Sequence, residues 1–462
     1  MFNINVMKKN IAIVLTIYSI IFFSVNIFGQ NLERQTTLGA RLDMLSETNN
    51  TSHLDYGLYI SAIKPDGTLG SMGVKSGMVL QKINNVKITS RSDVQSALKT
   101  IRENNAIEVV VNDNGSAKTF LGRAIGKPKE VHPKATVYYD EVVYKDNKLR
   151  SLLYIPKGAT TPPVVFYLQG YTCQSIEYNA SMPMKKLIDQ WIDSGFAVYL
   201  VEKPGLGDSD CKVACAEINF HQEMEGFSQA YKQLFKNSNI DTKNVFLYGH
   251  SMGGVVAPIL AQQIRPKGVM VFGTVGKSWF EYMKDVVTEQ QMLFGSTKAQ
   301  VTENSKQSFP FLEDLMLNRR SNTEMINNPK YKEYLQDQGV DKSLKNGYYM
   351  GRHYTFWQSL GDIDIPKEWS KVNTNVYIMH GEFDVQAINA KYAKMIETNV
   401  NSNKGKAEFS IIPKTDHVFI KFASMKDNIE ALTNGTYSTL LRNNYNPEVA
   451  EYSIKWMNKL ID

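Results

Sequence analysis

The chain has 462 residues, of which 43% are hydrophobic, 11% aromatic and 21% charged, and its formal net charge is +6 at pH 7. This length exceeds the size at which one hydrophobic core usually stops growing, so we expect two or more domains, and the composition excludes a disordered chain. The positive charge is small and scattered, without a block rich in lysine and arginine, so we expect no nucleic-acid partner.

The N-terminus has the layout of a secretory signal peptide, which we place at residues 1–29. Lys8 and Lys9 precede an apolar run from Ile11 to Phe28, and a small residue, Gly29, closes the run. The sequence therefore predicts export to the periplasm or the extracellular space. The run is also nearly as long as the roughly 20 residues that span a bilayer, so an uncleaved anchor facing outside the cytoplasm is the alternative. Only that alternative involves a membrane.

Residues 30–125 are expected to form a small α+β domain. Alternating apolar positions in YGLYISAI and AIEVVV predict strands, and RSDVQSALKTIRE predicts a short amphipathic helix that begins at a Ser/Asp cap. A Leu-Gly segment at Leu38, Gly39 and Ala40 begins the unit, and LGSMGVKSGMVLQKINNVKI alternates turn glycines with a further strand. Together these features resemble a bacterial-type PDZ domain, although Met78 replaces the aspartate that is usual in the glycine-rich stretch.

The PDZ resemblance implies a peptide-binding groove beside the strand that starts near Leu38. Backbone N–H groups of Leu38, Gly39 and Ala40 would receive a carboxylate or an added strand there. The implied partner is a peptide or a protein C-terminus, and nothing in this unit looks catalytic. A structural prodomain or spacer that binds nothing is the alternative.

A linker is expected at residues 126–134, where glycine and two prolines interrupt any periodicity. From residue 135 to 462 the pattern changes: TVYYDEVVY and RSLLYIP, joined by the polar KDNKL, predict an antiparallel hairpin. Apolar runs of strand length then alternate with amphipathic helices such as MKKLIDQWIDSG, which indicates a mostly parallel sheet with helices on both faces. The apolar runs are PVVFYLQG, FAVYLVEKPG, NVFLYGHS, GVMVFGTVG, NVYIMHGEFD and EFSIIPKTDH.

The stretch FLYGHSMGG ends a predicted strand, opens a predicted helix and contains a Gly-x-Ser-x-Gly motif around Ser251. The motif alone is a weak signal, but a strand, the motif and a helix in succession form a nucleophile elbow. In such an elbow small residues, here Gly249 and Gly253, let the serine sit at a sharp turn with its hydroxyl exposed. We therefore expect Ser251 to be a catalytic nucleophile.

A serine nucleophile needs a base within hydrogen-bond reach and a carboxylate that orients the base. Asp384 ends NVYIMHGEFD and His417 ends EFSIIPKTDH, so both follow predicted strands and both come after the serine. This is the chain order of α/β-hydrolases, with Asp384 as the acid and His417 as the base. Glu382 is the alternative acid, and Asp416 is expected to cap its loop.

The tetrahedral intermediate of acyl transfer needs two N–H donors directed at its oxyanion. We expect the first donor to be the amide of Met252, which follows the nucleophile. The second is expected from LQGYTCQSIE, where Gly170 allows close approach and the Tyr171 amide is our choice. The His-Gly pair that is usual in this loop reads Gln169-Gly170 here, which leaves the exact donor open.

Residues 135–462 thus resemble the α/β-hydrolase superfamily over nearly their whole length. The stretches GYTCQSIE, PGLGDSDCKVACAEINF and HGEFDVQ also resemble a subgroup of bacterial hydrolases. In that subgroup one cysteine follows the oxyanion loop and another precedes an acidic-x-aromatic segment, which implies a disulfide between Cys173 and Cys215. A Cys211–Cys215 bridge is the alternative, and three buried free thiols are a third arrangement.

Residues 277–366, between GVMVFGTVG and NVYIMHGEFD, are mostly helical in pattern and rich in aromatic residues. This is the place where α/β-hydrolases carry a helical cap over the acyl pocket. Its aromatic residues either line that pocket or form the cap's own core, and for Arg352 we expect a structural salt bridge. The aromatic candidates are Trp279, Phe280, Tyr354, Phe356 and Trp357.

The sequence as a whole predicts an exported serine hydrolase that cleaves carboxylic esters through an acyl-enzyme intermediate, with no metal and no organic cofactor. An aminopeptidase-like serine peptidase that acts on short peptides would use the same triad and a similar cap, so it is the first alternative. The second is a PDZ-type binding or scaffold protein with a vestigial hydrolase domain. The expected substrate is a small acyl ester or a peptide.

Overall fold

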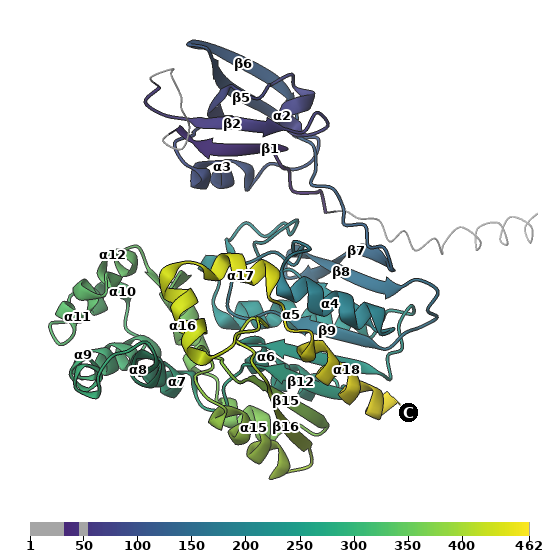
Figure 1. Ribbon diagram of the computed structural model, residues 1–462, viewed down its shortest axis with the longest axis vertical. Coiled ribbons are helices and arrows are strands. Elements are labelled where there is room, and N and C mark those ends of the chain that lie inside the picture. The colour runs from purple at the N-terminus through teal and green to yellow at the C-terminus, as the bar shows by residue number, and fades with distance from the viewer. Residues whose placement is uncertain (1–31, 46–53, 462) are drawn as a thin grey trace, which may run out of the picture. The chain divides into compact units, whose positions relative to one another are not determined.

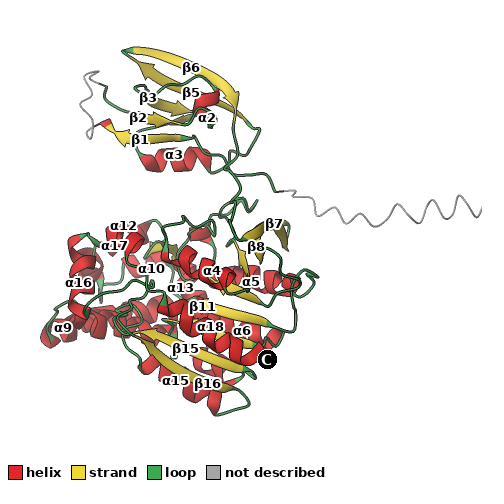
Figure 2. Ribbon diagram, turned by 45° about the vertical axis from the view of Figure 1, so that its right-hand side comes forward, coloured by secondary structure: helices red, strands yellow, loops and turns green. Residues whose placement is uncertain are grey.

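Residues 32–45 and 54–461 are described by the computed structural model, and they form two large β-sheets with separate hydrophobic cores (Figure 1, Figure 2). The predicted signal segment, residues 1–29, lies outside the described residues. Among the described helices, none combines the length and the apolar character that a membrane span requires.

The first sheet is antiparallel and has the strand order β1-β2-β3-β5-β6, with β4 paired to β3. Helix α3 begins at Ser90, whose hydroxyl accepts a hydrogen bond from the Asp93 N–H while the Asp93 carboxylate accepts one from the Ser90 N–H. The helix ends at Leu98, earlier than the sequence pattern predicted, and the pattern did not predict β6. The elements are β1 (Ala40–Met44), β2 (Leu58–Ile63), α2 (Thr68–Ser71), β3 (Val79–Ile83), β4 (Val86–Lys87), α3 (Arg91–Leu98), β5 (Ala106–Asp113) and β6 (Ser116–Arg123).

The second sheet has eight strands in the order β16-β15-β12-β11-β9-β10-β8-β7. In this order, β16, β15, β12, β11, β9 and β10 run parallel to one another. The predicted hairpin of β7 and β8 pairs with β10 in the antiparallel direction. The strands are β7 (Ala135–Tyr144), β8 (Asn147–Pro156), β9 (Val164–Leu168), β10 (Ala197–Val201), β11 (Val245–His250), β12 (Gly268–Phe272), β15 (Asn375–Gly381) and β16 (Lys406–Ile412).

Helices cover both faces of this sheet because successive residues of its buried strands point to opposite sides. In β9, Phe166 and Leu168 belong to one core while Val165 and Tyr167 belong to the other. Helices α5, α6 and α15 pack in the first core, and α4 and α18 pack in the second. Their bounds are α4 (Pro183–Asp193), α5 (Phe220–Leu234), α6 (Gly253–Gln263), α15 (Lys391–Asn401) and α18 (Glu448–Ile461).

The order of the strands reverses at β9, which has β10 on one side and β11 on the other. Open α/β sheets bind ligands at the carboxyl ends of their strands at such a point. Leu168, the last residue of β9, lies opposite Gly249 near the end of β11. The loops that follow these two strands therefore start side by side.

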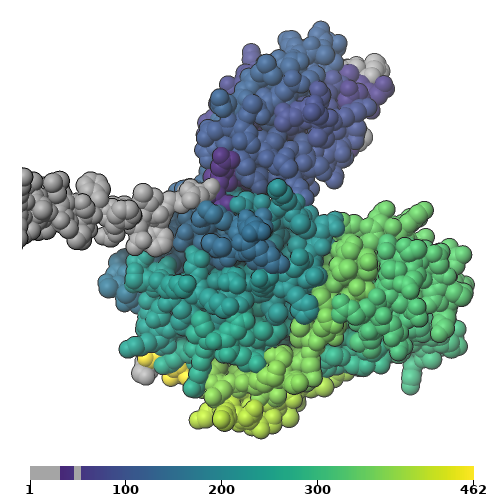
Figure 3. All heavy atoms as spheres, turned by 180° about the vertical axis from the view of Figure 1, so that it is seen from behind, coloured from purple at the N-terminus to yellow at the C-terminus, as the bar shows by residue number. Residues whose placement is uncertain are grey.

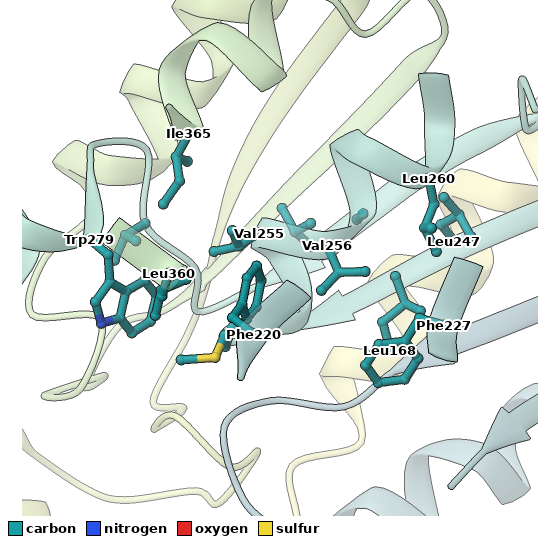
Figure 4. Close-up of a cluster of buried hydrophobic side chains, with 14 of the residues drawn as sticks. Leu168, Phe220, Phe227, Leu247, Val255, Val256, Leu260, Trp279, Leu360 and Ile365 are labelled. Atoms are coloured by element: carbon teal, nitrogen blue, oxygen red, sulfur yellow. The ribbon is translucent and has the colours of Figure 1, made fainter. Parts of the chain in front are cut away.

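The segment between β12 and β15 is mostly helical and contributes to the same core as α5 and α6. Figure 4 shows its residues Trp279, Leu360 and Ile365 in one cluster with Val255 of α6, and Figure 3 shows the segment in green as a contiguous body. Its elements are α7 (Trp279–Asp285), a π-helical turn (Val286–Gln290), α8 (Gln291–Leu293), α9 (Lys298–Met316), α10 (Asn322–Ile326), α11 (Lys332–Asp337), α12 (Val340–Lys345), β13 (Tyr348–Tyr349), β14 (Arg352–His353), α13 (Tyr354–Gly361) and α14 (Ile365–Ser370).

Two features of this segment differ from the sequence pattern. The short hairpin of β13 and β14 was not predicted, and α14 continues past the predicted boundary at residue 366. Of the aromatic candidates for a pocket lining, Trp279, Phe356 and Trp357 are instead buried in the core, whereas Phe280 and Tyr354 are only partly buried. The remaining helices are η2 (Cys215–Glu217), α16 (Met425–Asn434) and α17 (Tyr437–Asn443).

Candidate active site

Ser251 stands in a sharp turn between β11 and α6, as the nucleophile-elbow interpretation requires. Its φ angle is 53°, in the left-handed region that residues other than glycine rarely adopt. Its N–H donates to the Phe272 carbonyl at 2.9 Å, and its own carbonyl accepts from the Gly254 N–H at 2.9 Å. These backbone bonds hold the turn, which presents the serine side chain at the carboxyl edge of the sheet.

Asp384 and His417 form a buried pair beyond the ends of β15 and β16. The distance from His417 Nδ1 to Asp384 Oδ2 is 2.8 Å, and the second oxygen of Asp384 accepts from the N–H groups of Gln386 and Ala387. Burial opposes charge on both groups, but the neighbouring carboxylate raises the pKa of His417 above its usual value. The imidazole in turn holds the pKa of Asp384 below its usual range, although burial alone would raise it.

His250, the residue before Ser251, connects the elbow to His417. Its Nε2 donates to the His417 carbonyl at 2.8 Å, and its Nδ1 lies 3.3 Å from the Tyr167 hydroxyl. Burial lowers the pKa of His250 to about 3, so the ring is neutral. A neutral histidine thus holds the backbone of His417 beside the turn that carries Ser251.

The two other carboxylates considered from the sequence have different partners. Asp416 accepts from the N–H groups of Val418 and Ile420, so it caps its loop as predicted. Glu382 is exposed and accepts from the Lys414 N–H at 2.7 Å. The structure therefore brings Asp384, and not Glu382, to His417.

Gly273, which the sequence did not single out, makes room for the Asp384–His417 pair. Its φ angle is +60°, and a Cβ atom at this position would lie 2.7 Å from Asp384 Oδ2 and 2.9 Å from His417 Nδ1. Since real Cβ contacts are longer than these distances, any side chain here would displace the pair.

The loop after β9 lies directly against Ser251. A Cβ atom on Gly170 would be 3.1 Å from Ser251 Cβ and 3.7 Å from its Oγ. Gln169, in place of the usual histidine, bonds within its own loop through the Gln174 carbonyl. Neither the Tyr171 nor the Met252 N–H donates a hydrogen bond to another of the described residues, so both remain available to a ligand.

A disulfide joins Cys173, just beyond this loop, to Cys215 in η2, with a Cα–Cα distance of 5.8 Å. The pairing is the one that the hydrolase resemblance implied, and Cys211 keeps a free thiol. Nearby, Glu202 accepts from the Ser175 hydroxyl and the Ile176 N–H, and burial raises its pKa to about 8. Among the described residues, no cluster of histidine, cysteine, aspartate and glutamate is arranged to hold a metal ion.

Residues 177–420 match the profile of a protein family described as serine aminopeptidase, S33, and the match spans just over half of the chain. The chain belongs to the serine aminopeptidase S33 family. This S33 family member is a serine hydrolase with the α/β-hydrolase fold, and its strand order and its elbow are those of the fold. No curated protein sequence matches the chain significantly.

Several solved structures are similar to this S33 family member. The esterase Est1E from Butyrivibrio proteoclasticus, bound to ferulic acid, is 14% identical, with 64% of this chain and 98% of that chain covered and a TM-score of 0.40. Acetyl xylan esterase 1 from Thermoanaerobacterium sp. is also 14% identical, with coverage of 68% and 85% and a TM-score of 0.40. The proline iminopeptidase of Mycobacterium smegmatis is 12% identical, with coverage of 70% and 98% and a TM-score of 0.41.

Replacing Gly273 by alanine is expected to lower kcat/KM on a chromogenic substrate by about 100-fold, because small misplacements of reacting groups cost that much. Gly158→Ala is the matched control, since Gly158 also has a positive φ (+82°) but no atom within 4 Å of a Cβ. Both variants carry the same kind of backbone strain, and only the first disturbs the Asp384–His417 pair. Equal activity of the two folded variants would contradict this role of Gly273.

Proposed function

We propose that this protein is an exported serine hydrolase that cleaves carboxylic esters, with Ser251 as nucleophile, His417 as general base and Asp384 as the orienting carboxylate. The observation that carries the proposal is the 2.8 Å contact between His417 and Asp384, together with the backbone link from His417 to the residue before Ser251. The three residues follow β11, β15 and β16, so all of them lie beyond the carboxyl ends of parallel strands, which supports a shared site.

The proposed reaction starts when Ser251 Oγ attacks the ester carbonyl and His417 accepts the serine proton through Nε2. Asp384 faces Nδ1, so it fixes the ring tautomer and stabilises the imidazolium that forms. The N–H groups of Met252 and Tyr171 would stabilise the oxyanion of the tetrahedral intermediate. His417 then protonates the leaving alcohol, and water releases the acyl group from Ser251 by the same steps in reverse.

Two buried glutamates near the proposed site support an ester, over a peptide with a free N-terminus, as the proposed substrate. An aminopeptidase needs an ionised carboxylate to bind the substrate ammonium. Glu223, behind the loop after β9, is already paired with Lys203 and Arg352, and the pKa of Glu202 is raised to about 8 by its burial. Neither glutamate offers a free negative charge at neutral pH, which favours an uncharged acyl ester.

The helices between β12 and β15, residues 277–366 by the sequence pattern, are proposed as a cap on the acyl site. The ring of Tyr171 packs against Trp357 and Phe356 of this segment, with centroid distances of 5.7 and 6.4 Å. The core of the proposed cap thus contacts the loop that is proposed to supply an oxyanion donor.

Export fits the disulfide between Cys173 and Cys215, because such bonds persist mainly in oxidising compartments. The predicted signal segment, and with it the alternative of a membrane anchor, falls on residues 1–29, outside the described residues. We place the protein in the periplasm or the extracellular space on the strength of the disulfide and the sequence pattern.

Ser251→Ala is expected to abolish labelling by a fluorophosphonate and to lower ester hydrolysis by about 10⁴-fold or more, since the covalent step is lost. Ser402→Ala, at an exposed serine, is the control and should behave like the wild type. We also expect p-nitrophenyl esters to be cleaved faster than aminoacyl p-nitroanilides. Faster anilide cleavage would indicate the peptidase, and an unlabelled wild-type protein would indicate a scaffold with a vestigial hydrolase domain.

The activity should rise with pH as His417 loses its proton, with a midpoint above the ordinary histidine value of about 6.5 because Asp384 raises the pKa of His417. Asp384→Asn removes that charge, so the midpoint should move to lower pH, and the rate should fall by about 10⁴-fold. The pH profile of kcat/KM measures both effects. Glu382→Gln, at the exposed alternative acid, should change neither the pH midpoint nor the rate. If the midpoint shifted in this variant and not in Asp384→Asn, Glu382 would be the orienting carboxylate.

We further propose that the first sheet and α3 form a PDZ-type module that binds peptides along β1. Within the described residues β1 is an edge strand that pairs only with β2, and α3 lies beside it, with Arg91 Nε donating to the Leu42 carbonyl at 3.2 Å. Leu38 and Gly39 lead into this strand, and Ala40 begins it. An extended peptide can add to such an edge while its carboxylate meets the backbone N–H groups at the start of the strand.

Fluorescent hexapeptides with an apolar C-terminal residue are expected to bind the full-length Ser251→Ala protein, which cannot cleave them. The same peptides with an amidated C-terminus are the matched control and should bind more weakly, since they lack the carboxylate. Fluorescence anisotropy measures both affinities. The absence of binding, or equal affinity for both forms, would support the alternative of a spacer that recognises no C-terminus.

A further inference from the structure

A cluster of charged side chains, Lys203, Glu223 and Arg352, is buried behind the loop after β9. Lys203 follows β10, Glu223 lies on α5 and Arg352 lies on β14, so three separate segments contribute to the cluster. The side chains are only 0%, 1% and 2% exposed. Glu223 bridges the two cations, with 2.8 Å from Lys203 Nζ to its Oε1 and 2.7 Å from Arg352 Nη2 to its Oε2.

Both cations also bind backbone carbonyls of the loop that lies against Ser251. Lys203 Nζ donates to the carbonyl oxygen of Gly170, and Arg352 Nη1 donates to that of Tyr171 at 3.0 Å. Two successive peptide groups of the loop are therefore held by buried positive charges.

The direction of a carbonyl determines the direction of the N–H group in the same peptide unit, because the unit is planar and trans. The Gly170 carbonyl and the Tyr171 N–H belong to one peptide group and point in opposite directions. With the carbonyl bound to Lys203, the Tyr171 N–H points away from the buried cluster. This N–H has no acceptor among the described residues, and Gly170 lies against Ser251.

We propose that Lys203, Glu223 and Arg352 are positioning residues that hold the Tyr171 N–H in the orientation that an oxyanion requires. The inference rests on the proposed function, since only attack by Ser251 creates that oxyanion. All three side chains are buried, so none of them is proposed to touch the substrate. They act through the backbone of the loop, which could otherwise rotate this peptide group and turn a carbonyl oxygen toward the reacting centre.

The energetics favour this role over a purely structural one. Burying an ion costs several kcal/mol, and well-packed apolar residues of similar size often give equal or greater stability. Burial lowers the pKa of Lys203, and the carboxylate of Glu223 opposes that shift. When all three groups are ionised, the cluster carries one more positive than negative charge, which suits a loop that must stabilise a developing negative charge.

Arg352 also connects the proposed cap to the loop. Its guanidinium lies 3.7 Å from the centroid of the Phe356 ring, and the same ring packs against Tyr171. Arg352 belongs to the segment between β12 and β15, so the orientation of the loop depends on the position of that segment. The structural salt bridge that the sequence predicted for Arg352 is confirmed, and its partner is Glu223.

The test compares Arg352→Met with Arg150→Met in the full-length protein. Arg150 is a comparable buried arginine, 1% exposed, that pairs with the Asp208 carboxylate at 3.0 Å and donates to the Asp140 and Leu32 carbonyls at 3.1 and 2.8 Å. Each substitution removes one buried guanidinium from a carboxylate and from at least one backbone carbonyl, so each should lower the thermal midpoint. Of the two arginines, only Arg352 binds the loop beside Ser251.

Arg352→Met removes a partner of Glu223, which holds Lys203, and frees the peptide group next to the proposed donor. We therefore expect kcat on a p-nitrophenyl ester to fall by about 10²-fold, the cost of one lost oxyanion donor, with little change in KM. Inhibition by a trifluoromethyl ketone, which adds to the serine as a tetrahedral oxyanion, should weaken by a similar factor. Arg150→Met should leave both quantities close to the wild-type values. If Arg352→Met prevents folding, Arg352→Lys replaces it, since lysine keeps the charge but lacks the fork that reaches both acceptors.

Wild-type kcat and inhibitor affinity in a folded Arg352 variant would overturn the inference, and so would a raised KM at unchanged kcat. An equal loss of kcat in Arg150→Met would overturn it too, because it would show a general effect of destabilisation. A failure of the proposed function is distinguishable from these outcomes. In that case the wild-type protein itself would show no ester turnover that depends on Ser251.

Discussion

The parallel pairing of β9 with β11 is the constraint on which the rest of the site depends. It aligns Leu168 with Gly249, so the loop that contains Gly170 and the turn that contains Ser251 leave the sheet as neighbours. The pairing is possible because both strands are apolar on both faces and are covered by helices on each side. Every other group of the proposed site is placed relative to these two loops.

Burial of polar groups around that edge is compensated by specific partners. Asp384 is fully buried, and its oxygens accept hydrogen bonds from His417 and from two backbone N–H groups. His250 is neutral, and both of its ring nitrogens have hydrogen-bond partners. The buried ammonium group of Lys203 forms an ion pair with the carboxylate of Glu223. These three groups therefore also fix their neighbours, and leaving any of them unpaired would carry a desolvation cost of about 1–3 kcal/mol or more.

Local sequence patterns located most elements of the large sheet, because buried parallel strands appear as continuous apolar runs and their covering helices as amphipathic segments. They also indicated Ser251, Asp384 and His417, since each follows a strand and the three occur in the order of the fold. The hairpin of β13 and β14 was missed because two-residue strands have no periodicity to detect. Helix α3 is shorter than its pattern, and a propensity pattern marks helix ends poorly.

The sequence by itself determined the class of fold, the elbow and the order of the candidate triad, because these depend on short stretches of chain and on their succession. Only the tertiary structure revealed Gly273 beside the Asp384–His417 pair, and only it showed that Lys203 and Arg352 hold the loop next to Ser251. These residues are far from one another in the chain, and their types occur commonly at surfaces. Their significance comes from contacts between distant segments, which no local pattern records.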